Sequence, residues 1–174
     1  MPAIEPPDLS TETGRLAFNR VLNERMPRKR AIAQGLARNE DGEILLCRLT
    51  YKTDLDLPGG IVDPKESPAD CLVREVAEEL GLRVVAGRLL AVNWLPPYRG
   101  WDDATLFLFD LGMLQRHVVA EAELLAREIA EVSWVAPERL ADLVAPYTAA
   151  MVTHVLAHPG QTAYLENSAP RERH

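Results

Sequence analysis

Three glutamates in one short segment have the spacing of a metal site. Glu75, Glu78 and Glu79 stand at positions i, i+3 and i+4, so in a helix their carboxylates share one side of adjacent turns. Like charges placed in this way repel each other, and a divalent cation reverses the sign of that interaction. Carboxylate oxygens suit the hard cations Mg²⁺ or Mn²⁺, and Mg²⁺ commonly completes its coordination with substrate phosphates. An acidic helix face taken alone is usually a solvated surface, so the neighbouring residues decide between the two interpretations.

The neighbouring residues favour metal-assisted phosphate chemistry. Gly59 and Gly60 lie just upstream, where backbone without side chains can approach the helix and offer a carbonyl oxygen to a cation. Glu66 adds a fourth acid before the helix begins. Arg74 can pair with Glu78 along the helix or hold a neighbouring carboxylate in a fixed rotamer.

These residues resemble a known signature. Gly60, five residues, Glu66, seven residues and then the run REVAEELGL from Arg74 to Leu82 match the Nudix box, G-x5-E-x7-R-E-U-x-E-E-x-G-U with U aliphatic, at every defined position. The order of expected strands around the box extends the resemblance over residues 31–158. It implies an α/β fold of the Nudix type, an α/β/α sandwich with a mixed sheet and a loop-helix-loop catalytic motif.

The resemblance also implies an activity and assigns roles by position. Nudix proteins typically hydrolyse a nucleoside diphosphate linked to another group, here an ADP-ribose-like compound or a modified nucleoside triphosphate. The implied cofactor is Mg²⁺, with Mn²⁺ as a possible substitute. The implied metal ligands are Glu75, Glu78, Glu79 and the carbonyl of Gly59 or Gly60, the implied orienting residues are Glu66 and Arg74, and the implied catalytic residues are Glu75, Glu78, Arg74 and Glu128.

The general base stays open between a box glutamate and an acid from a later segment. Four acids, Glu121, Glu123, Glu128 and Glu131, precede or enter the expected strand that ends at Trp134. Glu128 is the preferred candidate outside the box.

The expected substrate-binding residues lie outside the box. Trp94, Tyr98, Arg99 and Trp101 share a predicted loop and could stack a base and contact a phosphate, since an aromatic plane binds any base; these aromatics could equally just pack the loop. Arg48 is a further candidate. Pro97 resembles a placement in ADP-ribose pyrophosphatases and Tyr98 one in diadenosine polyphosphate hydrolases, so the substrate stays open.

Two other functions are alternatives to hydrolysis. A Nudix-fold module that senses a nucleotide without hydrolysing it would be expected to have a decayed box, and this box is intact. An isomerase of allylic diphosphates resembles a related branch of the fold, but neither Cys47 nor Cys71 lies in the expected substrate loop.

Turn residues and periodicity predict the elements that position these residues. Residues 31–37 and 44–49 read as a hairpin around the turn Asn39-Glu40-Asp41-Gly42. Residues 57–60 are expected to break regular structure, and residues 61–62 to resume an extended piece. Ser67 as N-cap, Pro68 in the first turn and Gly81 as the stop predict a helix over residues 68–80.

The sequence also predicts a helix over residues 14–26, strands over 84–92, 105–111 and 129–135, a loop over 93–103, and helices over 137–144 and 146–158. The expected organisation is an N-terminal arm over residues 1–26, partly ordered, a Nudix domain over 27–158 and a C-terminal tail over 159–174. Within that tail, residues 162–165 have enough apolar and β character either to dock on a sheet or to stay mobile.

Composition sets limits on partners. The chain has 174 residues, 26 Asp+Glu against 19 Lys+Arg and a net charge of −7. This balance argues against a nucleic-acid polymer as partner, because such binding needs clustered Lys and Arg side chains. No apolar run is long enough to span a bilayer and no signal peptide is evident, so we expect a cytoplasmic protein without a membrane partner. The expected partner is a small nucleotide derivative, and a homodimer is a possible assembly because relatives that resemble the chain commonly form one.

Overall fold

The computed structural model describes residues 8–171. Its elements, in chain order, are α1 (Glu12–Arg25), β1 (Arg30–Arg38), β2 (Ile44–Leu49), β3 (Leu55–Asp56), β4 (Gly59–Ile61), α2 (Pro68–Leu80), β5 (Leu89–Leu95), β6 (Ala104–Met113), α3 (Arg116–Ala120), β7 (Ile129–Val135), a 3₁₀ turn (Pro137–Arg139), α4 (Leu140–Leu143), α5 (Pro146–Ala157), β8 (Ala163–Glu166) and β9 (Ala169–Pro170). Residues 1–7 and 172–174, which belong to the expected arm and tail, lie outside the described residues.

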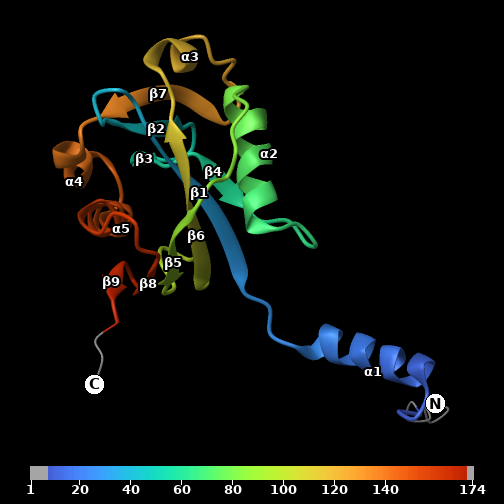
Figure 1. Ribbon diagram of the computed structural model, residues 1–174. Helices are drawn as coiled ribbons and strands as arrows, with labels where there is room; N and C mark the ends of the chain where they lie inside the picture. The colour runs from blue at the N-terminus through green and yellow to red at the C-terminus, as the bar shows by residue number, and fades with distance from the viewer. Residues whose placement is uncertain (1–7, 172–174) are drawn as a thin grey trace.

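One mixed sheet forms the centre of the molecule. Its strands follow the order β3-β2-β1-β6-β5-β8-β9, with β4 paired to β1 and β7 paired to β2. β1 runs parallel to β6, whereas β1 and β2 form the predicted antiparallel hairpin. Figure 1 shows α2 on one side of this sheet and α5 on the other. The predicted mixed sheet between helical layers is confirmed.

Each face of the sheet has its own hydrophobic core, because side chains alternate along a strand. On β1, Ala33 and Ala37 face the core that contains Leu72 and Val76 of α2. Leu36 faces the other core, which includes residues of α5. The box helix is therefore fixed against the sheet by its apolar stripe, which leaves its acidic side free for chemistry.

The box helix α2 begins and ends at the predicted residues. The Ser67 hydroxyl accepts a hydrogen bond from the backbone N–H of Asp70 at 3.1 Å, and Pro68 occupies the first turn. Gly81 has a φ of 66° and its N–H donates to the carbonyl of Ala77 at 3.1 Å, a geometry that glycine adopts without strain. The helix predicted over residues 14–26 is also present, as α1 with Thr11 as its N-cap.

Two predicted boundaries were wrong on either side of α2. Gly59 and Gly60 do not break regular structure, because they pair with β1 as part of β4. The strand expected from Val84 begins only at Leu89. Val84 and Ala86 pack against the α2-side core, so their apolar alternation reflects burial of an irregular segment rather than pairing in a sheet.

The predicted loop over residues 93–103 is shorter than expected. β5 continues to Leu95, and β6 begins at Ala104. At the tip, the N–H and C=O of Tyr98 exchange hydrogen bonds with those of Trp101 at 3.0 and 2.9 Å. Arg99 and Gly100 between them both have positive φ, so the aromatic residues stand on a tight hairpin rather than an open loop.

Part of the C-terminal segment completes the sheet. β8 pairs with β5 in parallel, with Tyr164 opposite Val92, and β9 pairs with β8. Asn93 secures this edge because its amide donates to the Ser168 hydroxyl at 2.8 Å. Residues 163–166 thus dock on the sheet of their own chain. Among residues 8–171, none of the helices is long and apolar enough to cross a membrane.

Candidate active site

Arg74 organises the acidic face of α2. Its Nε and Nη2 donate to the two oxygens of Glu66 at 2.8 and 2.9 Å, a bidentate pair with fixed geometry. Its Nη1 donates to Glu75 at 2.9 Å and to Glu78 at 3.2 Å. The backbone N–H of Asp63 also donates to Glu66 at 3.1 Å. One guanidinium therefore sets the positions of three carboxylates, and its hydrogen bonds lower the pKa of Glu66 to about 2.

Glu79 is the most deeply buried acid of the box. It is only 6% exposed, and burial, together with the nearby charges of Glu75, Glu128 and Asp56, raises its pKa to about 7. Burial also raises the pKa of Glu75, which Arg74 partly offsets. The negative charges of Glu75, Glu128 and Asp56 thus act on the buried Glu79, and a nearby cation would compensate them.

The two glycines allow this crowding. A Cβ on Gly60 would lie 2.5 Å from the carboxyl carbon of Glu75. Gly59 has a φ of 132°, and a Cβ there would lie 2.1 Å from the carbonyl oxygen of Ala33. The backbone of β4 therefore passes close to Glu75 only because Gly60 lacks a side chain, and it lies against β1 only because Gly59 lacks one.

The donor set suits a divalent cation. Three carboxylates and the nearby carbonyls are oxygen ligands of the kind that Mg²⁺ and Mn²⁺ prefer. Burial raises the pKa of Glu79 most, and the charges of Glu75 and Glu128 add a repulsion that a cation would relieve. Within residues 8–171, no three His, Cys, Asp or Glu side chains are already gathered around one point as ligands. Arg74 bonds both Glu75 and Glu78, so a cation held by these two carboxylates would compete with the guanidinium for them.

Glu128 lies near the box although it is distant in sequence. Its charge raises the pKa of both Glu75 and Glu79. The carbonyl of Glu128 accepts from the N–H of Thr50 at 2.9 Å, and the N–H of Leu125 donates to the carbonyl of Glu79 at 2.8 Å. These bonds tie the segment before β7 both to β2 and to α2.

The other candidates for the general base have different hydrogen-bond partners and neighbours. Glu131 pairs with Arg48, whose Nε lies 3.4 Å from its carboxylate, and Glu123 packs beside Gly81 at the end of α2. Arg48 itself also donates to the carbonyl of Thr53 at 3.5 Å. Glu128 bonds to the exposed Arg127.

The structure does not gather the expected substrate-binding aromatics in one place. Tyr98 meets Tyr147 of α5 edge-on, with ring centroids 6.1 Å apart, and the Arg99 guanidinium lies 5.1 Å from the Tyr98 ring. Trp101 instead stacks with Arg30 at 4.6 Å. Trp94 lies in β5, where its indole N–H donates to Asp103 at 3.1 Å.

A buried set of hydrogen-bonded polar side chains beside the box was not predicted from the sequence. Asp56 is 7% exposed; it accepts from the Gln34 amide at 2.8 Å and from Lys52 at 2.8 Å. Its charge raises the pKa of both Glu79 and Tyr147, so Asp56 acts electrostatically on the acids of α2 and on the tyrosine pair. The signal available in the sequence was an aspartate between two leucines that are both buried, Leu55 and Leu57.

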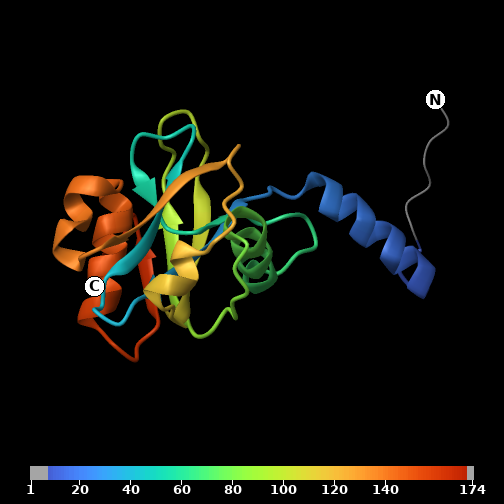
Figure 2. The same cartoon turned by 90° about the horizontal axis from the view of Figure 1, so that it is seen from above.

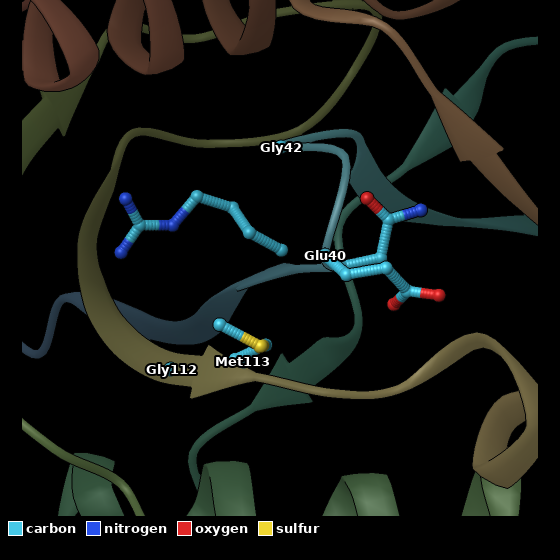
Figure 3. Close-up of a pocket in the computed structure, with 6 residues that line it drawn as sticks. Glu40, Gly42, Gly112 and Met113 are labelled. Atoms are coloured by element: carbon cyan, nitrogen blue, oxygen red, sulfur yellow. The ribbon is translucent and has the colours of Figure 1, made fainter.

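A separate surface pocket of about 440 Å³ lies at the opposite end of β1. Its lining comes from the β1–β2 turn and the end of β6, namely Arg38, Asn39, Glu40, Gly42, Gly112 and Met113. Figure 3 shows the Glu40 carboxylate turned away from Met113. None of the acids of α2 takes part in this pocket, so it is not part of the site described above.

Comparisons with known proteins agree with this arrangement. The NUDIX domain family model matches residues 28–155. A putative 8-oxo-dGTP diphosphatase of Bacillus subtilis is 32% identical over 108 residues, which cover 62% of this chain and 67% of the relative.

Solved structures share the fold. The MutT protein of Methanosarcina mazei Go1 superposes with a TM-score of 0.64 at 29% identity, covering 78% of this chain and 100% of that one. An ADP-ribose pyrophosphatase of Streptococcus suis superposes with a TM-score of 0.56 at 22% identity, covering 80% of this chain and 99% of that one.

A mixed sheet lies between helical layers, and a strand with two glycines packs beside an acidic helix at its edge. This arrangement is typical of hydrolases that act on phosphate anhydrides. The chain belongs to the NUDIX domain family. It is a Nudix hydrolase, an enzyme that cleaves pyrophosphate bonds.

Proposed function

We propose that this enzyme is a Mg²⁺-dependent hydrolase that cleaves the pyrophosphate bond of a nucleoside diphosphate linked to another group. The observation that carries the proposal is the acidic side of α2, where Arg74 bonds Glu75 and Glu78 and where burial, with the charges of Glu75 and Glu128, raises the pKa of Glu79 to about 7. Such a site favours a bound cation, and a cation there attracts a polyphosphate.

The metal ligands we propose are Glu75, Glu78 and Glu79, with a carbonyl of Gly59 or Gly60. Bound Mg²⁺ supplies neutralisation of phosphate oxygens and a more acidic water. Arg74 and Glu66 act as positioning residues, because their bidentate pair keeps the guanidinium fixed while Glu75 and Glu78 turn between it and the metal. Mn²⁺ offers the same ligand preference and is a possible substitute.

Glu128 is the proposed general base. It reaches the acidic cluster from a different segment, and the hydrogen bonds at Thr50 and Leu125 hold that segment in place. Because Glu128 is not on α2, it can accept the proton of the attacking water while the box glutamates remain metal ligands. The box glutamates remain the alternative for this role.

The substrate's nucleoside is proposed to bind beside the Tyr98–Tyr147 pair. Aromatic faces stack on any base, and Arg99 over Tyr98 adds a positive charge for a phosphate. Lys52, held by Asp56, suits contact with the phosphate nearer the nucleoside. Arg48, Trp94 and Trp101 remain proposed substrate contacts, although their present partners are Glu131, Asp103 and Arg30.

The relatives' names suggest two classes of substrate. One relative is described as a putative 8-oxo-dGTP diphosphatase and one similar structure as an ADP-ribose pyrophosphatase, so we propose a modified nucleoside triphosphate or an ADP-ribose-like compound. In either case the partner is a small nucleotide derivative.

A substrate panel tests the proposal. Phosphate or nucleotide release is measured for ADP-ribose, oxidised nucleoside triphosphates, dinucleoside polyphosphates and nucleotide sugars with Mg²⁺ or Mn²⁺, and mass spectrometry identifies the broken bond. We expect turnover of one class and loss of it with chelator. Tight binding across the panel without turnover would instead make the protein a nucleotide-sensing module.

A further inference from the structure

Asp56 of β3 is a buried acid that three donors hold in place. It is 7% exposed and accepts from the amide of Gln34 at 2.8 Å, from the ammonium of Lys52 at 2.8 Å and from the N–H of Leu57 at 3.0 Å. Taking a carboxylate out of water costs free energy, and apolar residues of similar volume often give an equally stable protein. Stability alone therefore does not explain why an acid occupies this position.

Gln34 is held in an orientation that leaves one of its own atoms unbonded. Its amide nitrogen faces Asp56, whose carboxylate accepts, so its amide oxygen points the other way. Gln34 is 6% exposed, and this oxygen has no hydrogen-bond partner within residues 8–171. A buried acceptor without a partner disfavours folding. The arrangement therefore orients Asp56 but leaves the Gln34 oxygen unsatisfied.

Gln34 also links Asp56 to the strand beside the acids of α2. It lies opposite Gly59 in the pairing of β1 with β4, and a Cβ on Gly59 would be 2.9 Å from the Cα of Gln34. The Gln34 side chain shares a face of β1 with Ile32 and Leu36, which pack in the core on the α5 side. Figure 2 shows α5 and α2 on opposite sides of the sheet. The hydrogen bond from Gln34 thus fixes the position of Asp56 relative to β4.

Lys52 is held by Asp56 but keeps donors for a ligand. An ammonium has three N–H groups, and within the described residues 8–171 the bond to Asp56 is the only one that this group makes. Burial lowers the pKa of Lys52, but the charge and hydrogen bond of Asp56 raise it by more, so the side chain is positively charged at neutral pH. An unrestrained lysine would lose rotamer entropy on binding a ligand, and the bond to Asp56 imposes that loss beforehand.

We propose that Gln34 and Asp56 are positioning residues that hold the Lys52 ammonium in place for a substrate phosphate. The inference rests on the phosphate contact proposed above for Lys52. Gln34 orients the carboxylate of Asp56, Asp56 orients Lys52, and only Lys52 touches the substrate. A cation ordered in advance strengthens binding of the substrate and of the transition state alike, so loss of the positioning should raise KM and leave kcat nearly unchanged.

The first test measures phosphate binding without a nucleoside. The probe is imidodiphosphate with Mg²⁺, a pyrophosphate analogue whose P–N–P bridge resists hydrolysis, titrated into the full chain in a calorimeter. Lys52→Met should raise its Kd about 10-fold to 100-fold and Gln34→Met about 2-fold to 10-fold. An unchanged Kd in Lys52→Met, or no binding to the wild type, would overturn the proposal. This readout needs no turnover, so its result is separate from that of the proposed hydrolysis.

For Asp56→Asn, positioning and simple electrostatics predict changes of opposite sign. Loss of a negative charge by itself strengthens the binding of an anion, whereas loss of the position of Lys52 weakens it, so we expect the Kd of imidodiphosphate to rise. In a double-mutant cycle, Gln34→Met should have no further effect on this Kd in the Lys52→Met chain, because Gln34 acts through Lys52. Additive effects, or tighter binding by Asp56→Asn, would contradict the positioning role.

Asn93→Leu is the matched control for Gln34→Met, at a buried amide whose nitrogen and oxygen both have partners. Asn93 is 0% exposed, and its amide donates to the Ser168 hydroxyl at 2.8 Å and accepts from the Ser168 N–H at 2.9 Å. This variant should lower the Tm and keep the wild-type Kd. Gln34→Met should keep the Tm within about 2–4 °C of the wild type and raise both the Kd and the KM of the best panel substrate at constant kcat. A lower Tm in Gln34→Met with an unchanged Kd would show a structural role and overturn the proposal.

Discussion

The acid site on α2 and the aromatic hairpin, residues 96–103, are held in place in different ways. In the acid site, Arg74 bonds three carboxylates and Gly60 lets the backbone of β4 lie against Glu75. In the aromatic hairpin, Tyr98 is 45% exposed and Trp101 is 59% exposed, and each contacts one cation through its ring.

We propose that this difference separates catalysis from specificity. The acid site has bonds that allow few alternative positions, which suits chemistry that depends on geometry. The exposed rings can adjust to different ligands, which suits a family whose members act on different nucleotides. We therefore expect substitutions on α2 to reduce turnover for every substrate, and substitutions at the tyrosine pair to change which substrates bind.

The largest effect is expected for Glu79→Gln. The variant keeps the shape of the side chain but removes a proposed metal ligand, so turnover should fall by more than the roughly 100-fold that loss of a supporting contact can cost. The fall should be the same for all substrates of the panel. Isothermal titration with Mn²⁺ and steady-state rates measure it, with circular dichroism to confirm the fold. Full activity would contradict the assignment of this site.

A smaller loss, about 10-fold to 100-fold, is expected for Arg74→Lys. Lysine keeps the charge but loses the two-pronged contact with Glu66. Because the lost interaction acts through the metal ligands, the metal concentration for half-maximal activity should rise together with the loss of kcat. The control is Arg116→Lys, at an arginine that makes two hydrogen bonds to Asp41 outside the acid site. Equal effects of the two substitutions would contradict a positioning role for Arg74.

The same comparison explains how far the sequence alone leads. α2 was predicted with its observed bounds because Ser67, Pro68 and Gly81 act on their immediate neighbours, and the box carries its own spacing. The contact of Gln34 with Asp56 and that of Tyr98 with Tyr147 were not predicted, since they join segments far apart in the chain and leave no period in the sequence. β8 was ambiguous for the same reason, because its parallel partner β5 lies some 70 residues earlier.

The tyrosine pair should respond through KM. Removing one ring by Tyr147→Ala should cost about 1–3 kcal/mol of substrate binding, the usual value of a base stacked on an aromatic side chain, while kcat changes little. Tyr164→Ala is the control, because this exposed ring lies on β8 and its hydroxyl bonds to Glu166. Kinetics across the substrate panel give the result. A fall in kcat without a change in KM would show that the tyrosines support the fold of the site rather than the base.

The smallest expected effect is a pH dependence of stability without metal. Burial raises the pKa of Glu79 from 4.5 to about 7, so the folded chain holds this proton more tightly than the unfolded chain does. The protonated side chain therefore favours folding at low pH, and this contribution is lost as the pH rises from about 4.5 through about 7.

Glu79→Gln removes that titration. In chelator the Tm of the variant should match the wild type near the lower limit of this range and exceed it by a few degrees above the upper limit. Added Mg²⁺ should raise the Tm of the wild type and not that of the variant, since binding to the folded state alone stabilises it. Thermal unfolding followed by circular dichroism measures both differences. A difference in Tm between variant and wild type that stays constant with pH would contradict this assignment. It would mean that ionising Glu79 in the acid site does not reduce the free energy of unfolding.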